Sequence, residues 1–422
     1  MILYYILVLS LPFLSHPLFG LKVGPLTVEK YLGAICFLYA VLHAAVRRRA
    51  PGLFRTTQAR AFLLFFLLAS ISWLALGRSL TATTMLDVYG SHLLFLVTTV
   101  ALIDSLPRLR WALVTAVAAM GLVSLYVIRD WQLGSAVYGA SYRPGYVAGD
   151  ANFFTASVLL SLPVALLLLW NERSAAVRIF CFGSLLVTLA AITLAASRGG
   201  FLGLLVAMGW LLWRSRTRFR NLVLVGAALG LLLAISPLSP VARFLHPDYS
   251  DTDSVRIHLA LWRAGLRIVR DHPLTGIGVG QFKAAVGEYS SEKDLSLLAH
   301  NTYLEIAAEM GLGGLGLFLV IFGSSFRTLT RVRLAAERHG PPLLRVAATG
   351  IQAGLLGFGV AAFFVSAEFL RMFWFMLFLS ICLLALEQEE AARVAAAEGR
   401  PSTAEAARAE WWTGAEAGND AW

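Results

Sequence analysis

Apolar runs long enough to cross a membrane recur along the whole chain, and they limit its possible folds more than any other feature. A run of about 18 residues or more can span, as a helix, a hydrocarbon core roughly 30 Å thick. Only 14% of the residues are charged, and the mean hydropathy is +0.72. Soluble domains contain about 25% charged residues. The chain is therefore predicted to be an all-α integral membrane protein.

The runs predict about twelve transmembrane helices. Their ranges are 2–19, 28–46, 61–76, 86–103, 111–128, 153–170, 179–196, 200–213, 221–238, 301–325, 346–367 and 372–387. The first has neither a basic leader nor a small-residue cleavage site, so we expect it to be retained. The predicted membrane domain is 1–387, including one long loop, 239–300, whose length is unusual unless it is functional. The Ala/Glu-rich tail 388–422 is expected to be a frayed helix or disordered.

Basic residues alternate between the two sides of the predicted bundle. Five loops on one side hold 18 of the 35 Lys and Arg residues, whereas the opposite short loops hold seven. The positive-inside rule makes the arginine-rich side cytoplasmic, together with both termini and the tail. Loop 239–300 is then external. The net charge of +10 is mostly this topology signal, and we expect no nucleic-acid binding because no soluble basic domain carries the charge.

We expect no metal ion and no cofactor. The three cysteines fall inside apolar runs and behave as small hydrophobic residues. Asp251 and Asp253 have a spacing used by metal-dependent glycosyltransferases, but Asp253 or Ser254 is favoured as the N-terminal cap of the next helix. The glycines of HPLTGIGVGQF follow no strand and face outward, which indicates a turn and not a nucleotide-binding loop.

Within the long loop, the stretch SVRIHLALWRAGLRIVRD predicts an amphipathic helix. Its apolar stripe consists of Val255, Leu259, Trp262, Leu266 and Val269, and an arginine stripe about 100° round the helix consists of Arg256, Arg263, Arg267 and Arg270. The helix is expected to lie on the outer membrane surface with the apolar stripe downward. The arginines either anchor it to anionic head groups or bind a diphosphate, for which the bidentate guanidinium is well suited.

Other polar residues are expected at the same external face. Arg198 lies in the tight turn ASRGGFLG, where an arginine is costly unless it is paired, binds a ligand or snorkels to head groups. Arg143, Asp150 and Asn152 lie near the start of the sixth span, and Asp150 either caps that helix or pairs with an arginine. Of the eight histidines, only His300 begins a span directly after the long loop.

Three stretches resemble one known family. HNTYLEIAAEMGLGG fits H-N-x9-G-x-x-G and resembles the signature of O-antigen ligases, and ASRGG and DSVRIHLALWRAGLRIVRDHPLTGIGVGQF resemble the other blocks of that family. The resemblance covers about 140 to 320 in motif and nearly all of the chain in architecture. It implies a metal-independent, inverting glycosyltransferase of the membrane GT-C type. Such an enzyme transfers O-antigen polysaccharide from undecaprenyl diphosphate to the lipid A core, at the periplasmic face of the bacterial inner membrane.

The resemblance also implies site residues. His300 becomes the candidate catalytic base, and Arg198 and Arg256 become candidates for binding the donor diphosphate. Arg263 remains a further candidate because the helix arginines lie so close together that more than one could match. We add Arg143 from its position. Possible supporting residues are Asn301, Asp150 and Glu305.

These residue types suit the chemistry of glycosyl transfer. A histidine with an ordinary pKa near 6.5 can take the acceptor proton at neutral pH and contributes roughly 10² to 10⁴ in rate. If the span begins at His300, small residues at 307, 311 and 314 lie below it and allow a neighbouring helix to approach. Glu305 and Glu309 then lie on the far side, and we expect Glu305 to contact another span or the external loop.

Three alternative functions remain open. The same donor serves O-antigen polymerases and protein O-oligosaccharyltransferases, although the latter usually carry a longer C-terminal region. A membrane transporter is the alternative from another class, but we see none of the internal repeat typical of transporters. The sugars and the oligomeric state are not predicted.

Overall fold

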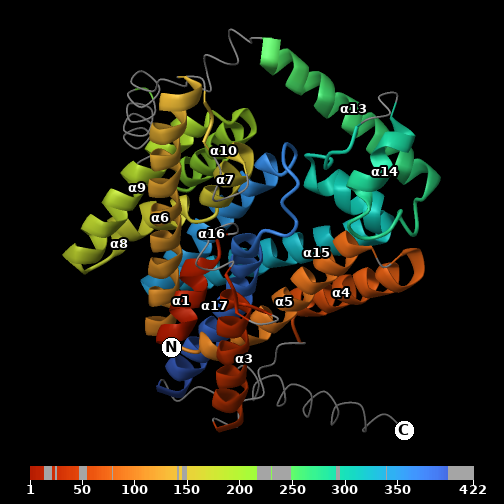
Figure 1. Ribbon diagram of the computed structural model, residues 1–422. Helices are drawn as coiled ribbons and strands as arrows, with labels where there is room; N and C mark the ends of the chain where they lie inside the picture. The colour runs from red at the N-terminus through yellow and green to blue at the C-terminus, as the bar shows by residue number, and fades with distance from the viewer. Residues whose placement is uncertain are drawn as a thin grey trace, which may run out of the picture.

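The computed structural model describes residues 1–13, 21–23, 26–46, 55–77, 79–139, 142–144, 150–215, 230, 249–290, 295–338 and 340–397. Its helices are α1 (Ile2–Ser10), α3 (Val28–Val46), α4 (Thr57–Leu76), α5 (Leu80–Leu102), α6 (Leu106–Tyr138), α7 (Ala151–Leu159), α8 (Leu162–Asn171), α9 (Ala175–Ala195), α10 (Arg198–Arg214), α13 (Tyr249–Asp271), α14 (Phe282–Tyr289), α15 (Thr302–Arg338), α16 (Pro342–Ala361) and α17 (Arg371–Ala397) (Figure 1). A short antiparallel hairpin pairs β1 (Lys22–Val23) with β2 (Leu26–Thr27). The described part of the chain is otherwise helical where it is regular, as predicted.

Nine helical segments of the described residues are long and apolar enough to cross a membrane. They are α3, α4, α5, α6, α9, α15, α16, α17 and the segment Ala151–Asn171 that α7 and α8 form together. α10 has 17 residues and is slightly shorter. α1 covers the first half of the predicted span 2–19, of which 14–19 lie outside the described residues, and of the predicted span 221–238 only residue 230 is described. The chain is thus an all-α membrane protein, and the count of twelve stays a prediction.

The core of the molecule is centred on α17. Every residue from Met372 to Leu383 is buried, as expected for a helix that is apolar all round and lies inside a bundle (Figure 1). Trp374 lies between Phe62 of α4 and Phe318 of α15, with ring centroids 4.7 and 6.3 Å away. α17 also continues to Ala397, so the first ten residues of the predicted tail extend this helix.

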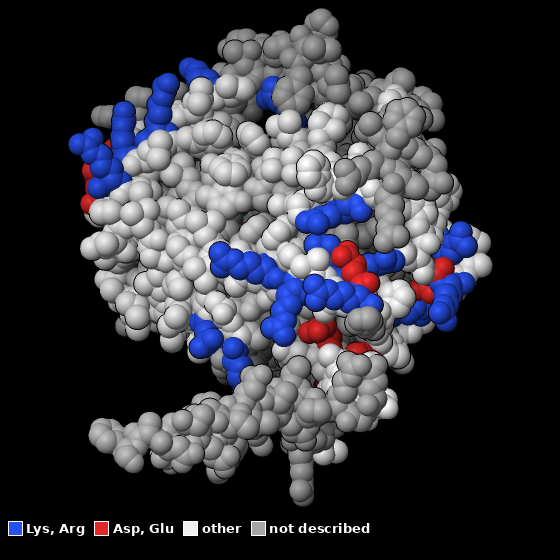
Figure 2. Space-filling model, turned by 180° about the vertical axis from the view of Figure 1, so that it is seen from behind, with Lys and Arg blue, Asp and Glu red and all other residues white. Residues whose placement is uncertain are grey.

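The outer surface of the bundle is apolar. Large side chains such as Ile35 and Leu38 of α3 and Ile179 of α9 are more than half exposed. Figure 2 shows a broad uncharged area on the back of the molecule, with Lys and Arg side chains gathered at the upper left and across the lower right. Such a surface is stable in contact with lipid tails and not with water.

The long loop carries two helices, α13 and α14, which pack together beside α15 (Figure 1). The predicted amphipathic helix is therefore present, but of the predicted stripe only Trp262 and Val269 pack against the buried cluster of the loop. Leu261, Ala264 and Ile268 form the buried side. Val255 and Leu259, from the predicted apolar stripe, are 46% and 44% exposed.

The start of α13 also differs from the prediction. The helix begins at Tyr249, so Asp253 and Ser254 lie inside it and do not cap its N-terminus. Their side chains, and that of Asp251, are outside the described residues. The prediction failed because the helix runs one further turn toward the N-terminus than its apolar and arginine stripes.

α15 is broken at Gly311, where φ is 68° and ψ is −178°. The break opens the helix backbone to the segment that follows α13. The Leu312 amide donates to the Pro273 carbonyl at 2.8 Å, and the Ile277 amide donates to the Ala308 carbonyl at 2.9 Å. A side chain at 311 would place its Cβ 2.3 Å from the Leu274 carbonyl oxygen. Gly311 therefore allows a loop to approach α15 closely. The prediction was that it allows a neighbouring helix to approach.

Candidate functional site

His300 does not begin a helix. α15 starts at Thr302, and His300 itself has a left-handed backbone with φ of 47°. The predicted arrangement of small residues directly below His300 is therefore wrong, because it assumed that the helix starts there. A non-glycine residue in this conformation is uncommon and persists only when its surroundings hold it.

The residues on either side of His300 are fixed by hydrogen bonds. The Ala299 amide donates to Glu305 Oε2 at 3.0 Å, and Ser366 Oγ donates to the same carboxylate oxygen. Asn301 Oδ1 caps α15 by accepting from the Leu304 amide at 3.0 Å. The Thr302 hydroxyl donates to the Val365 carbonyl and accepts from the Ala367 amide. Glu305 therefore contacts the end of the external loop, as predicted, and also the turn between α16 and α17.

Glu309 lies one turn further along α15 and has a separate task. It is 7% exposed, and its two carboxylate oxygens accept from the Gly280 and Phe282 amides at 2.7 and 3.0 Å. These contacts hold the turn between α13 and α14 against α15. The turn expected for HPLTGIGVGQF is confirmed, with positive φ at Gly276, Gly278 and Gly280.

A cavity of about 340 Å³ lies beside this end of α15. Its lining combines basic and aromatic residues from four parts of the chain: Arg143, Asn152, Arg198, Gly199, Leu202, Val255, His258, Leu259, Trp262 and Phe364. Arg143 and Arg198, both predicted from the sequence, thus lie on one cavity. His300 is not in its wall, but its ring centroid is 5.1 Å from that of His258, which is.

The turn between α9 and α10 presents Arg198 to the cavity. Ser197 caps α10 by accepting from the Gly200 amide at 3.2 Å, and its hydroxyl donates to Asn152 Oδ1 at 2.8 Å. Gly199 lies so close to Phe364 that an added Cβ would be 2.7 Å from that side chain. The Ser-Arg-Gly-Gly sequence thus lets the turn pack tightly while the arginine beside the cap faces the cavity.

Arg143 is held by the same two segments. Its Nε donates to the Ala195 carbonyl at 3.1 Å, and a terminal nitrogen donates to Asn152 Oδ1 at 3.3 Å. Burial lowers the pKa of Arg143, the Asp150 carboxylate raises it, and the Arg198 charge lowers it. Two cationic groups close together in a half-buried wall favour an anionic ligand such as a diphosphate.

Asp150 has the capping role, the first of the two roles that the sequence left open. Its Oδ1 caps α7, accepting from the Asn152 and Phe153 amides at 2.6 and 2.8 Å. Its negative charge also raises the pKa of Arg143 and of His300.

The protonation of His300 depends on its surroundings. Burial lowers the pKa of His300, the neighbouring His258 lowers it further, and Asp150 raises it. His300 is therefore predominantly neutral at pH 7, which is the state that a base requires.

His258, Trp262 and Phe364 line the cavity but were not predicted as site residues from the sequence. Trp262 is paired with Phe364 at 6.4 Å between ring centroids, and the buried Trp262 Nε1 has no hydrogen-bond partner among the described residues. The only available signal was spacing, since His258 and Trp262 are four residues apart on one helix face. A residue such as Phe364, from a distant turn, gave no local signal.

Arg256 and Arg263 are not brought to this cavity. They line a separate pocket of about 170 Å³, together with Arg267 and Tyr289. Leu259 lines both pockets, so the arginines of α13 lie next to the cavity and not in its wall. The apolar stripe, through Val255 and Leu259, faces the cavity instead.

Metal ligands are not clustered in the part of the chain that the structure describes. No three His, Cys, Asp or Glu side chains there come together in a way that could hold an ion. The three cysteines are buried and free. Because Asp251 and Asp253 have undescribed side chains, metal independence stays a prediction.

Comparison with known families gives one match. Residues 183–319 match the family model described as O-antigen ligase. The chain carries an O-antigen ligase domain. The matched segment contains Arg198, His258 and His300, whereas Arg143 and Phe364 lie outside it. No curated protein matches the chain.

The match indicates the class of activity. The protein is a glycosyltransferase of the O-antigen ligase or polymerase type, a multi-pass membrane protein that acts on lipid-linked polysaccharide. The matched segment of the O-antigen ligase domain begins within α9 and ends within α15. It thus includes α10 and α13, which supply most of the cavity wall.

Proposed function

We propose that the protein is an O-antigen ligase. In this proposal it transfers O-antigen polysaccharide from undecaprenyl diphosphate to the lipid A core, at the periplasmic face of the bacterial inner membrane. The observation that supports it most is the pairing of Arg143 and Arg198 on one cavity, with the His258 and His300 rings beside them. A base and a binding site for an anionic leaving group are thus adjacent.

The proposed reaction is a single displacement. His300 accepts the proton of the acceptor hydroxyl while the oxygen attacks the anomeric carbon of the donor sugar. The bond from that carbon to the diphosphate breaks, and its electron pair leaves with undecaprenyl diphosphate. Arg143 and Arg198 stabilise the departing charge without a metal ion, since preorganised cations suffice for this role. One displacement inverts the anomeric configuration.

The backbone of His300 decides which variant tests its role best. Alanine is strained in the left-handed conformation by roughly 1–2 kcal/mol, whereas asparagine and glycine tolerate it. His300→Asn therefore removes the imidazole and keeps the local fold. We expect it to lower the transfer rate by about 10² to 10⁴.

The experiment uses purified protein reconstituted with undecaprenyl-diphosphate glycan and lipid A core. Wild type, His300→Asn and an Arg198→Gln variant are compared with and without EDTA. Extension of the lipid-linked glycan without transfer to lipid A core would show a polymerase. Full activity in His300→Asn would remove the base assignment. Loss of wild-type activity with EDTA would contradict metal independence.

A further inference from the structure

Another basic pocket lies at the opposite end of α10 from the candidate site. It measures about 320 Å³ and is lined by the ends of α8, α10 and α15 and by the first turns of α16. α10 runs from Arg198, at the cavity, to Arg214, at this pocket. α16 has 20 residues and is about 30 Å long, which equals the thickness of the hydrocarbon core. The two sites therefore lie at opposite membrane surfaces.

Positive charge in the pocket exceeds negative charge. Arg214, Arg333 and Arg345 line it, and Glu337 is its only carboxylate. Glu337 pairs with Arg333 at 2.7 Å but is itself 41% exposed. Arg333 is 4% exposed, and its buried Nε has no hydrogen-bond partner among the described residues. A buried guanidinium nitrogen without a protein acceptor is costly, so an anionic group beside Arg333 would be stabilising.

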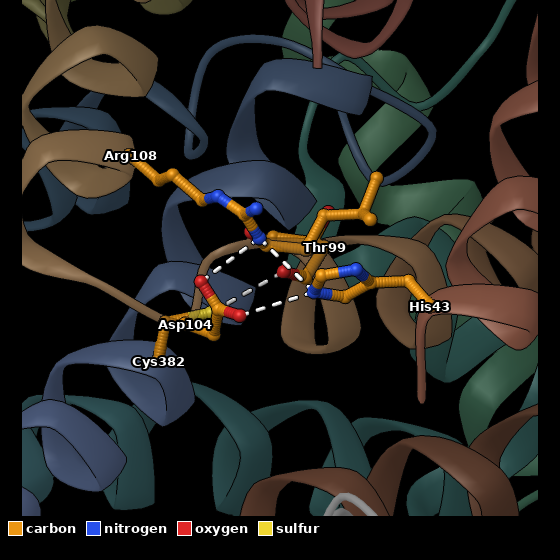
Figure 3. A network of polar contacts seen from close by, with 6 residues as sticks. His43, Thr99, Asp104, Arg108 and Cys382 are labelled. Carbon is orange, nitrogen blue, oxygen red and sulfur yellow. Dashed lines mark hydrogen bonds and ion pairs between the residues drawn. The ribbon is translucent and has the colours of Figure 1, made fainter. Parts of the chain in front are cut away.

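Two other arginines at this end of the bundle, Arg108 and Arg110, are paired with carboxylates. Figure 3 shows Arg108 and His43 pointing toward Asp104, at 2.9 and 3.1 Å. Arg110 pairs with Glu172 at 2.8 Å. Arg108 and Arg110 are thus each matched by a carboxylate, whereas the three arginines around the pocket share one.

The rest of the pocket wall is mixed. Its polar members are Asn171, Ser215 and Thr349, and its apolar part consists of Leu166, Leu167, Trp170, Met208, Leu211, Leu212 and Val346. Trp170 is 51% exposed, as is usual for a tryptophan at the level of lipid head groups. A free inorganic anion would contact the arginines but not the apolar part of the pocket wall. A phospholipid would use both, because its acyl chains begin next to its phosphate.

We propose that this pocket binds an anionic phospholipid. Arg214, Arg333 and Arg345 would surround its phosphate, and the leucines of the pocket wall would contact the first part of an acyl chain. Basic pockets between transmembrane helices bind lipid head groups in this way. The lipid would lie in the leaflet opposite the candidate active site. The proposal does not depend on the ligase reaction.

The test measures binding to the full-length protein in neutral detergent. Dioleoylphosphatidylglycerol, dioleoylphosphatidylcholine and inorganic phosphate are compared by thermal unfolding and by native mass spectrometry. We expect the first lipid alone to raise the melting temperature and to remain bound. Arg214→Gln and Arg345→Gln, both at exposed positions, should each weaken its apparent affinity roughly fivefold.

Arg331→Gln is the matched control. Arg331 is exposed near the end of α15, two residues from Arg333, and does not line the pocket. It should leave lipid binding unchanged. An equal loss in Arg331→Gln would show that only surface charge attracts the lipid and would overturn the proposal. Equal binding of phosphatidylcholine, or of free phosphate, would also overturn it.

Discussion

At the scale of single residues, the left-handed backbone of His300 is maintained by contacts on both sides. Glu305 holds Ala299, and the Thr302 hydroxyl is fixed by the turn between α16 and α17. The backbone on both sides of His300 is thereby held by α15 and by the turn between α16 and α17. The charges around the imidazole then set its protonation, because His258 and Asp150 act on its pKa in opposite directions.

The pH profile of transfer should reflect these two neighbours. Because burial and His258 lower the pKa of His300, the wild-type rate should fall only below about pH 6.5 as His300 becomes protonated. Asp150→Asn keeps the cap on α7 but removes the charge, so the acid limb should move to lower pH. His258→Asn should move it to higher pH. Measurement of kcat/KM from about pH 4.5 to about pH 8, a range around the ordinary histidine pKa of about 6.5, tests both shifts. Shifts of the acid limb in the same direction for the two variants would contradict the scheme.

Removal of the Glu305 carboxylate should affect both stability and rate. Glu305→Ala leaves the Ala299 amide and the Ser366 hydroxyl buried without their acceptor, at a cost of about 1–3 kcal/mol for each group. Glu305→Gln retains an acceptor oxygen and should cost less. We expect kcat to fall with little change in KM, since the carboxylate positions His300 and does not contact substrate. A pure loss of folded protein, with normal kcat per folded molecule, would show that Glu305 has no positioning role.

At the scale of elements, the break in α15 couples this helix to the loop that follows α13. Gly311 has a backbone conformation that other residues avoid, and a Cβ there would meet the Leu274 carbonyl. Gly316 lies in the same helix, with nothing within 4 Å of the equivalent position. The two glycines thus have opposite expected responses to substitution.

Gly311→Ala should destabilise the protein strongly. Backbone strain of about 1–3 kcal/mol is added to the clash with the loop, and the melting temperature in detergent should fall markedly. Gly316→Ala should be neutral or stabilising, by up to about 1 kcal/mol, because alanine is the better helix former. Equal melting temperatures for the two variants would show that the loop does not pack into the break.

The helices could be predicted from the sequence, but their partners could not. Long apolar runs identify spans because each run is long enough by itself, and the prediction for α3 has the same bounds as the helix. For α13, both Val255 with Leu259 and Leu261 with Ile268 have helical spacing, so periodicity does not tell which pair packs. The proximity of Arg143 and Arg198, and of His258 and His300, depends on tertiary contacts between distant segments, which no local pattern contains.

At the scale of the whole molecule, one bundle separates two basic pockets at its opposite ends. α10 and α16 pack so closely that a Cβ at Gly203 would lie 2.4 Å from the Gly357 carbonyl oxygen. α10 contributes to both the candidate site and the basic pocket around Arg333, and α16 contributes to the second of these. The arrangement predicts that the two ends face different compartments.

Labelling of single cysteines in intact cells should confirm that orientation. Ser296→Cys, in the long loop, should react with a membrane-impermeant maleimide, because Ser296 is exposed beside α14. Glu337→Cys, at the other end of α15, should react only after the membrane is opened. The three native cysteines are buried and provide a low background. The reverse pattern would contradict the orientation inferred from the arginine-rich loops.

The apolar side of the candidate cavity has a consequence for kinetics. Leu202, Val255 and Leu259 line the cavity and are 37%, 46% and 44% exposed, so the lipid-linked donor of the proposed reaction can enter directly from the bilayer. Its effective concentration is then a mole fraction in the membrane and not a molarity in water. Adding inert lipid at fixed donor should slow the reaction by surface dilution, whereas adding buffer to the same vesicles should leave the rate unchanged.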